Sequence, residues 1–71
     1  MYSSFKDWLF VQLQGDDILD MRDYDNPEEI TLTTLYEDTE LTEDAYETYK
    51  AQYISYCKRY GLMCVWDFSE V

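Results

Sequence analysis

Five tyrosines in the second half of the chain recur at intervals of three, four, three and four residues. They are Tyr46, Tyr49, Tyr53, Tyr56 and Tyr60. In an α-helix this spacing places all five rings in one stripe along about five turns. Thr42 precedes the segment as a potential N-cap, and Gly61 follows it where a helix commonly ends. The pattern predicts a helix over residues 43–60, and we call its five rings the tyrosine stripe.

The tyrosine stripe suits either the core of the protein or a recognition surface. Tyrosine is enriched at protein interfaces because it offers a large, rigid ring with a polar end. Five buried hydroxyl groups would each need a hydrogen-bond partner, and a small domain offers few. We therefore expect the stripe to face the core with at least two rings partly exposed. Tyr46 and Tyr56 are the first candidates for a contact with a partner.

Two more helices are predicted in the first third of the chain. Ser4 is a suitable N-cap for a helix over residues 4–14, in which apolar side chains recur at helical intervals. Asp16 or Asp17 is a suitable N-cap for a short helix over residues 16–23.

The segment from residue 27 to residue 36 carries conflicting signals. Asn26 followed by Pro27 and two acids is typical of a helix start. The next residues are rich in β-branched side chains, and apolar and polar positions alternate as in a strand. We favour a helix over residues 27–36. The alternative is an α+β fold with strands near residues 30–36 and 62–68.

Composition supports a single folded domain over residues 1–71. Hydrophobic residues make up 46% of the chain and aromatic residues 18%, which is far more than a disordered acidic chain contains. We expect a mainly α, small compact domain of three or four helices with an extended C-terminal segment. The expected core is Phe5, Trp8, Leu9, Leu13, Ile18, Leu19, Leu32, Leu35, Tyr49, Tyr53, Ile54 and Trp66.

The charge is strongly one-sided. The protein has a net charge of −11, and thirteen of its sixteen carboxylates lie between Asp16 and Glu47, where the only base is Arg22. Such charge opposes compaction through self-repulsion, and a surface that serves solubility normally mixes both signs. Six of these acids lie at predicted helix starts, where their negative charge interacts favourably with the positive end of the helix dipole. The seven without an expected capping role are candidates for partner binding: Asp20, Asp23, Asp25, Glu37, Asp38, Glu40 and Glu47.

Several function classes are disfavoured. The chain has no histidine and no phosphate-binding glycine loop, and nothing is placed to activate Cys57 or Cys64, so we expect no enzyme and no cofactor. The acids of residues 20–28 lack the glycine and the spacing of a calcium loop, so no metal site is expected. The negative charge disfavours direct binding to nucleic acid or to anionic membranes. No signal peptide or apolar span is recognisable, and we expect a cytoplasmic protein with reduced cysteines.

In size and composition the chain resembles phage-encoded DNA-mimic inhibitors of restriction, CRISPR or DNA-repair enzymes. The resemblance implies an anti-restriction or anti-CRISPR inhibitor that acts in the host cell cytoplasm. Its partner would be a basic nucleic-acid-binding protein, because a surface of carboxylates imitates the field of duplex DNA. The alternative is a small structural or adaptor protein whose charge serves solubility, with the Tyr46–Tyr60 stripe as a candidate homodimer interface.

Overall fold

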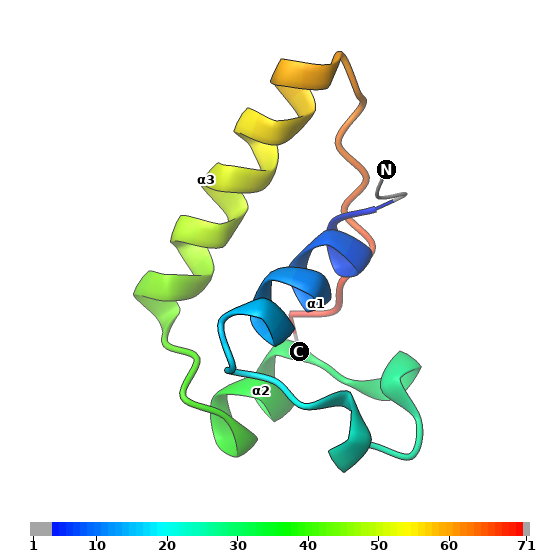
Figure 1. Ribbon diagram of the computed structural model, residues 1–71, viewed down its shortest axis with the longest axis vertical. Coiled ribbons are helices and arrows are strands. Elements are labelled where there is room, and N and C mark those ends of the chain that lie inside the picture. The colour runs from blue at the N-terminus through cyan, green and yellow to red at the C-terminus, as the bar shows by residue number, and fades with distance from the viewer. Residues whose placement is uncertain (1–3, 71) are drawn as a thin grey trace.

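The computed structural model describes residues 4–70 and consists of helices, turns and one extended segment (Figure 1). In chain order the elements are α1 (Phe5–Gly15), the 3₁₀ turns η1 (Met21–Asp23) and η2 (Pro27–Glu29), α2 (Leu32–Asp38) and α3 (Glu43–Tyr60). Residues 62–70 are extended, and the described residues contain no strand. The mainly α fold with an extended C-terminal segment is confirmed. The α+β alternative is wrong, because residues 32–36 lie in α2 and residues 62–68 have no strand partner.

The ends of α1 and α3 follow the predicted caps. The side chain of Ser4 accepts a hydrogen bond from the backbone N–H of Asp7 at 3.3 Å. That of Thr42 accepts one from the N–H of Ala45 at 3.2 Å. Gly61 ends α3 with φ = 66°, a left-handed conformation that glycine adopts without steric cost. Each cap involves residues at most four positions apart, which is why the sequence predicts both helices well.

The predicted helix over residues 16–23 is wrong. Asp17 has φ = 58°, a left-handed conformation that interrupts any continuous helix at this point. The backbone N–H groups of Ile18 and Leu19 both turn back to the carbonyl of Leu13, at 2.9 and 3.3 Å. Only η1 is helical. Its N-cap is Asp20, whose carboxylate accepts from the backbone N–H of Arg22 at 3.0 Å.

The helix predicted over residues 27–36 is divided in two. Asn26 caps the start as expected, with its side chain accepting from the N–H of Glu28. The turn that begins at Pro27 ends at Ile30, which is extended. Thr31 then acts as a second N-cap, accepting from the N–H of Thr34 at 3.3 Å, and α2 begins. The capping signal at Asn26 was therefore correct, whereas the β-branched segment is extended only at Ile30 and Thr31 and is helical from Leu32 onward.

The core lies where α1, α3 and the extended segment meet. Phe5 is 1% exposed, and its ring contacts aromatic rings from α1, α3 and the extended segment at centroid distances of 4.9–6.4 Å. Such contacts combine a large buried area with favourable ring geometry. Hydrophobic residues buried in addition to the predicted ones are Phe10, Ile30, Leu41, Tyr46 and Cys57.

Three predicted core residues lie outside the core. Ile54 is 39% exposed because it follows Tyr53 on α3 and so points away from the buried stripe. Trp66 is 49% exposed, although its ring packs on Phe5 and Tyr53 at the edge of the core. Ile18 is half-buried beside the core.

The extended segment is held along its length by hydrogen bonds rather than by a sheet. The carbonyl of Val65 accepts from the backbone N–H of Phe5 at 2.8 Å, and that of Ser69 accepts from the N–H of Leu32 at 3.0 Å. Two hydroxyl groups of the tyrosine stripe also bind it: Tyr53 accepts from the N–H of Val65 at 3.0 Å, and Tyr46 donates to Glu70 at 2.9 Å. Two of the three buried tyrosines of the stripe thus find their partners in the C-terminal segment, and the third, Tyr49, donates to the carboxylate of Asp16 at 2.5 Å.

Candidate protein-binding surface

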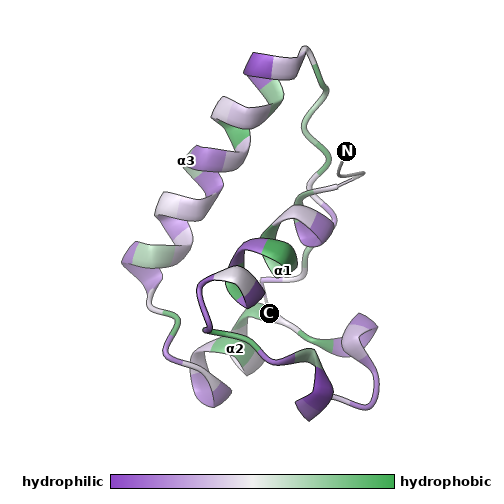
Figure 2. Cartoon of the chain, viewed as in Figure 1, coloured by the Kyte–Doolittle hydropathy of each residue, from purple (hydrophilic) through white to green (hydrophobic). Residues whose placement is uncertain are grey.

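All thirteen carboxylates between residues 16 and 47 are exposed, and we call this set the acidic surface. They extend from the end of α1 through η1, η2 and α2 into the start of α3, and η1, η2 and α2 lie together at one end of the molecule (Figure 1). Figure 2 shows hydrophilic residues concentrated in the turns of this end. The residues are Asp16, Asp17, Asp20, Asp23, Asp25, Glu28, Glu29, Glu37, Asp38, Glu40, Glu43, Asp44 and Glu47.

Few of these charges are neutralised within the chain. Among the described residues, only Asp20 and Glu47 of the acidic surface form ion pairs, with Arg22 at 2.9 Å and with Lys50 at 3.8 Å. Hydrogen bonds from the Arg22 side chain and backbone lower the pKa of Asp20. Exposed pairs of this kind contribute little to stability. The acidic surface therefore keeps most of its negative charge.

Asp20 differs from the other six candidate acids. It caps η1 and holds the Arg22 guanidinium, so it has the local structural role that the sequence did not predict. Neutralising Asp20 would disturb a turn as well as a surface charge. The six remaining candidates have no capping side-chain bond among the described residues: Asp23, Asp25, Glu37, Asp38, Glu40 and Glu47.

Tyr24 brings two parts of the acidic surface together. This half-buried residue lies between η1 and η2, and its pKa is raised by burial first and then by the charges of Asp38 and Asp23. A hydrogen bond to Asp38 contributes to the same shift. The η1 turn therefore lies near the C-terminal end of α2. The sequence analysis missed Tyr24, although its position between two aspartates was a usable signal.

Tyr36 has the same relation to a second group of acids. Its pKa is raised by burial first and then by the charges of Glu43, Glu47 and Glu70. These carboxylates come from α3 and from the extended segment, so acids far apart in the sequence lie around one half-buried ring. The acidic surface thus contains aromatic rings as well as charges.

The C-terminal end of α2 carries charges of the unfavourable sign. Glu37 and Asp38 lie in its last turn, where the helix dipole is negative, and no base lies there. The first turn, where acids would be favourable, contains none. This placement opposes folding of α2, although Asp38 also accepts a hydrogen bond from Tyr24.

The tyrosine stripe divides between core and surface. Tyr46, Tyr49 and Tyr53 are buried, Tyr56 is half-buried and Tyr60 is 55% exposed. The expectation of at least two partly exposed rings is confirmed. Tyr46, which the sequence suggested as a partner contact, is only 3% exposed, and its ring packs on the rings of the core.

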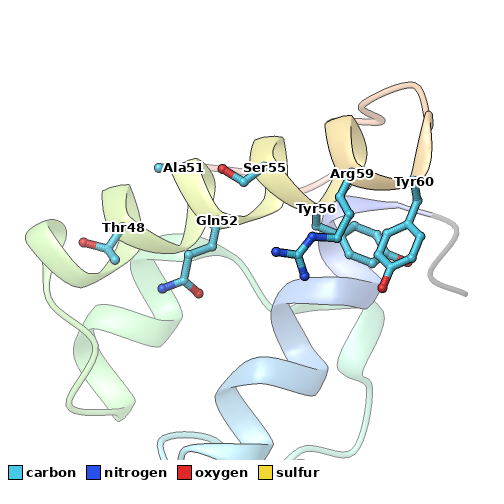
Figure 3. Close-up of a pocket in the computed structure, with 7 residues that line it drawn as sticks. All are labelled: Thr48, Ala51, Gln52, Ser55, Tyr56, Arg59 and Tyr60. Atoms are coloured by element: carbon cyan, nitrogen blue, oxygen red, sulfur yellow. The ribbon is translucent and has the colours of Figure 1, made fainter.

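Tyr56 and Tyr60 lie beside a shallow groove on α3 with a volume of about 380 Å³ (Figure 3). Their rings are neighbours, with centroids 5.0 Å apart. The exposed bases Lys58 and Arg59 are at this end of α3, opposite the acidic surface. The groove is lined by Thr48, Ala51, Gln52, Ser55, Tyr56, Arg59 and Tyr60.

The described residues offer no grouping of three or more histidine, cysteine or carboxylate side chains suited to a metal ion. No helix among them has the length and apolar character needed to span a membrane. The chain matches no family model, and neither the curated proteins nor the solved structures include one that is significantly similar to it.

Proposed function

We propose that this protein binds the basic, nucleic-acid-binding site of another protein in place of nucleic acid and thereby inhibits it. The observation that carries the proposal is the exposure of all thirteen acids of the acidic surface, of which only two are ion-paired among the described residues. A cation-rich site on a partner would relieve this repulsion. Relief of the repulsion that exists in the free protein therefore contributes to the free energy of binding.

The charge density supports mimicry of nucleic acid. The longest dimension of the molecule is 33 Å, over which duplex DNA carries about 20 phosphate charges. The chain has sixteen carboxylates, and the thirteen of the acidic surface are gathered toward one end. Its local density of negative charge is thus comparable with that of a duplex.

Placement of acids at the end of α2 also supports the proposal. Glu37 and Asp38 oppose the dipole of their own helix, and such a cost is expected where residues serve binding rather than stability. Tyr24 and Tyr36 add rings that contact a partner beside the carboxylates. Inhibitors of the phage anti-restriction or anti-CRISPR type act in this way, and the host cell cytoplasm would be the place of action.

The alternative function, an adaptor that dimerises through the tyrosine stripe, has less surface available than the sequence suggested. Three of the five rings are occupied by the protein's own core, which leaves Tyr56 and Tyr60. Binding through these two rings and the groove would depend on apolar contact. Such an interaction would weaken little with added salt, whereas binding through the acidic surface would weaken steeply.

The test is affinity capture from a bacterial lysate with two variants of equal charge. One variant is E37Q/D38N/E40Q, at the end of α2 and the loop that follows. The other is D17N/E28Q/E29Q, elsewhere on the acidic surface. Captured proteins are eluted with rising salt or with competing duplex DNA.

We expect the wild type to retain nucleic-acid-binding proteins that duplex DNA displaces. The E37Q/D38N/E40Q variant should lose most of this capture, and D17N/E28Q/E29Q should lose less. Retention that duplex DNA and salt both leave unchanged would contradict the proposal. Capture that survives E37Q/D38N/E40Q but is lost on replacing Tyr60 with alanine would favour the adaptor.

A further inference from the structure

The chain reverses direction immediately after α3 and folds back along it. Gly61 makes the reversal, and the backbone N–H of Leu62 donates to the carbonyl of Cys57 at 2.8 Å. This hydrogen bond fixes the start of the extended segment against the last turns of α3. Cys57 itself is buried, with 2% of its surface exposed.

A second attachment lies just beyond Cys64. The hydroxyl of Tyr53 accepts from the backbone N–H of Val65 at 3.0 Å and lies 3.5 Å from the carbonyl of the same residue. Tyr53 and Cys57 are four residues apart and therefore neighbours on one face of α3. Cys64 is thus held over the position of Cys57 by attachments on both sides.

These attachments place the two cysteines close together. Both cysteines are free, and Cys64 is half-buried against the core cluster to which Cys57 belongs. Burial raises the pKa of the Cys64 thiol, and a hydrogen bond with Cys57 raises it further. The nearby Tyr53 hydroxyl interacts with both cysteines. The backbone attachments therefore bring together two cysteines that are seven positions apart in the sequence.

We propose that Cys57 and Cys64 are the site of an intrachain disulfide that fastens the extended segment to α3. The oxidant is a small-molecule disulfide such as oxidised glutathione. The thiolate of Cys64, the more accessible residue, attacks it to form a mixed disulfide and releases one glutathione thiolate. The thiolate of Cys57 then attacks the sulfur of Cys64 and releases the second. The two cysteines lose two protons and two electrons, and oxidised glutathione is reduced to two thiols.

Closing this bond would stabilise the packing of the extended segment on the rest of the domain. The extended segment carries Phe68, which packs on Phe10, and it supplies the carbonyl that accepts from Phe5. A covalent link at Cys64 would hold these contacts in place. The site is separate from the acidic surface, so the inference stands whether or not that surface binds a partner.

The experiment measures how strongly the fold favours the bond. The full chain is equilibrated with mixtures of reduced and oxidised glutathione at pH 8, both folded and in concentrated urea. Acid quenching and intact-mass analysis then give the effective concentration of the two thiols in each state. We expect at least a tenfold higher effective concentration in the folded protein. By linkage, each factor of ten corresponds to 1.4 kcal/mol of added stability.

The oxidised monomer should have a mass lower by two hydrogen atoms and a Tm higher by about 5–10 °C. The matched control is C64S together with Met63→Cys. Met63 is 86% exposed, so this control moves the thiol one residue along the segment to a position that faces solvent. Its effective concentration should fall to the value measured in urea. A C64S variant should show no glutathione-dependent change in Tm.

Three outcomes would overturn the proposal. The folded wild type could stop at a glutathione adduct on Cys64, it could link two chains in preference to closing, or its effective concentration could equal that in urea. The last comparison requires no variant, so a failure of any variant to fold leaves the test intact.

Discussion

Replacing Glu37 and Asp38 by glutamine and asparagine should stabilise this protein. Both carboxylates are exposed in the last turn of α2, where they face the negative end of the helix dipole with no base nearby. A charge at a helix end changes stability by about 0.3–1 kcal/mol. Because the two groups are exposed, we expect a combined gain of about 1 kcal/mol. In a domain of this size that corresponds to a rise in Tm of about 4–8 °C.

The assay is urea unfolding followed by tryptophan fluorescence, at low and at high ionic strength. The gain should shrink as salt is added, because the repulsion that it removes is screened. Asn at position 38 keeps a side-chain oxygen that can accept from Tyr24, so this hydrogen bond survives. A loss of stability, or a gain that salt leaves unchanged, would refute the argument from the helix dipole.

The control is E28Q/E29Q, which removes the same charge from the acidic surface. These two acids lie in the first turn of η2, where negative charge is favourable. Their removal should leave stability unchanged or lower it slightly. If both pairs stabilise equally, the effect comes from net charge and not from the position of Glu37 and Asp38. A stabilised protein that no longer binds its partner would separate the two roles of these residues.

Three further predictions concern the fold. Leu9→Ala should cost about 2–5 kcal/mol in urea unfolding, because Leu9 is 0% exposed, whereas Ile54→Ala should cost much less. Thr42→Ala should cost about 0.5–2 kcal/mol and reduce the helical circular dichroism if α3 depends on this cap. Burial and the hydrogen bond to Asp16 raise the pKa of Tyr49 to about 12, so its contribution should be intact below pH 10 and lost as the pH rises toward 12. Over this range Tyr49 alone should lower the free energy of unfolding by about 1.4 kcal/mol per pH unit. Tyr49→Phe should remove this contribution, and an unchanged dependence of unfolding on alkaline pH would contradict the assignment.

The sequence by itself determined α1 and α3 because their signals are local. Ser4, Thr42 and Gly61 act on backbone groups within four residues, and the apolar and tyrosine positions repeat at the helical interval. The candidate acids are all exposed, as charged side chains mostly are.

Tertiary structure alone decided the path between these helices. Asp16 and Asp17 had a plausible capping pattern, but Asp17 adopts a left-handed conformation where the chain turns back on the end of α1. Residues after Pro27 carried both helix and strand signals, and the hydrogen bond from Leu32 to Ser69 ties the start of α2 to the extended segment. Such choices depend on contacts between residues far apart in the sequence, which local propensity does not contain.

The same holds for the side chains of the tyrosine stripe and for the two cysteines. The spacing of the tyrosines places five rings on one face of α3, but side chains from other elements determine which of these rings are buried. Tyr46 is covered by the rings of Phe5 and Phe68, whereas Tyr60 extends beyond the core and stays exposed. Cys57 and Cys64 meet only because Gly61 reverses the chain and Tyr53 holds the returning segment. The sequence determines which side chains share a helix face, and packing between distant parts of the chain determines what each face contacts.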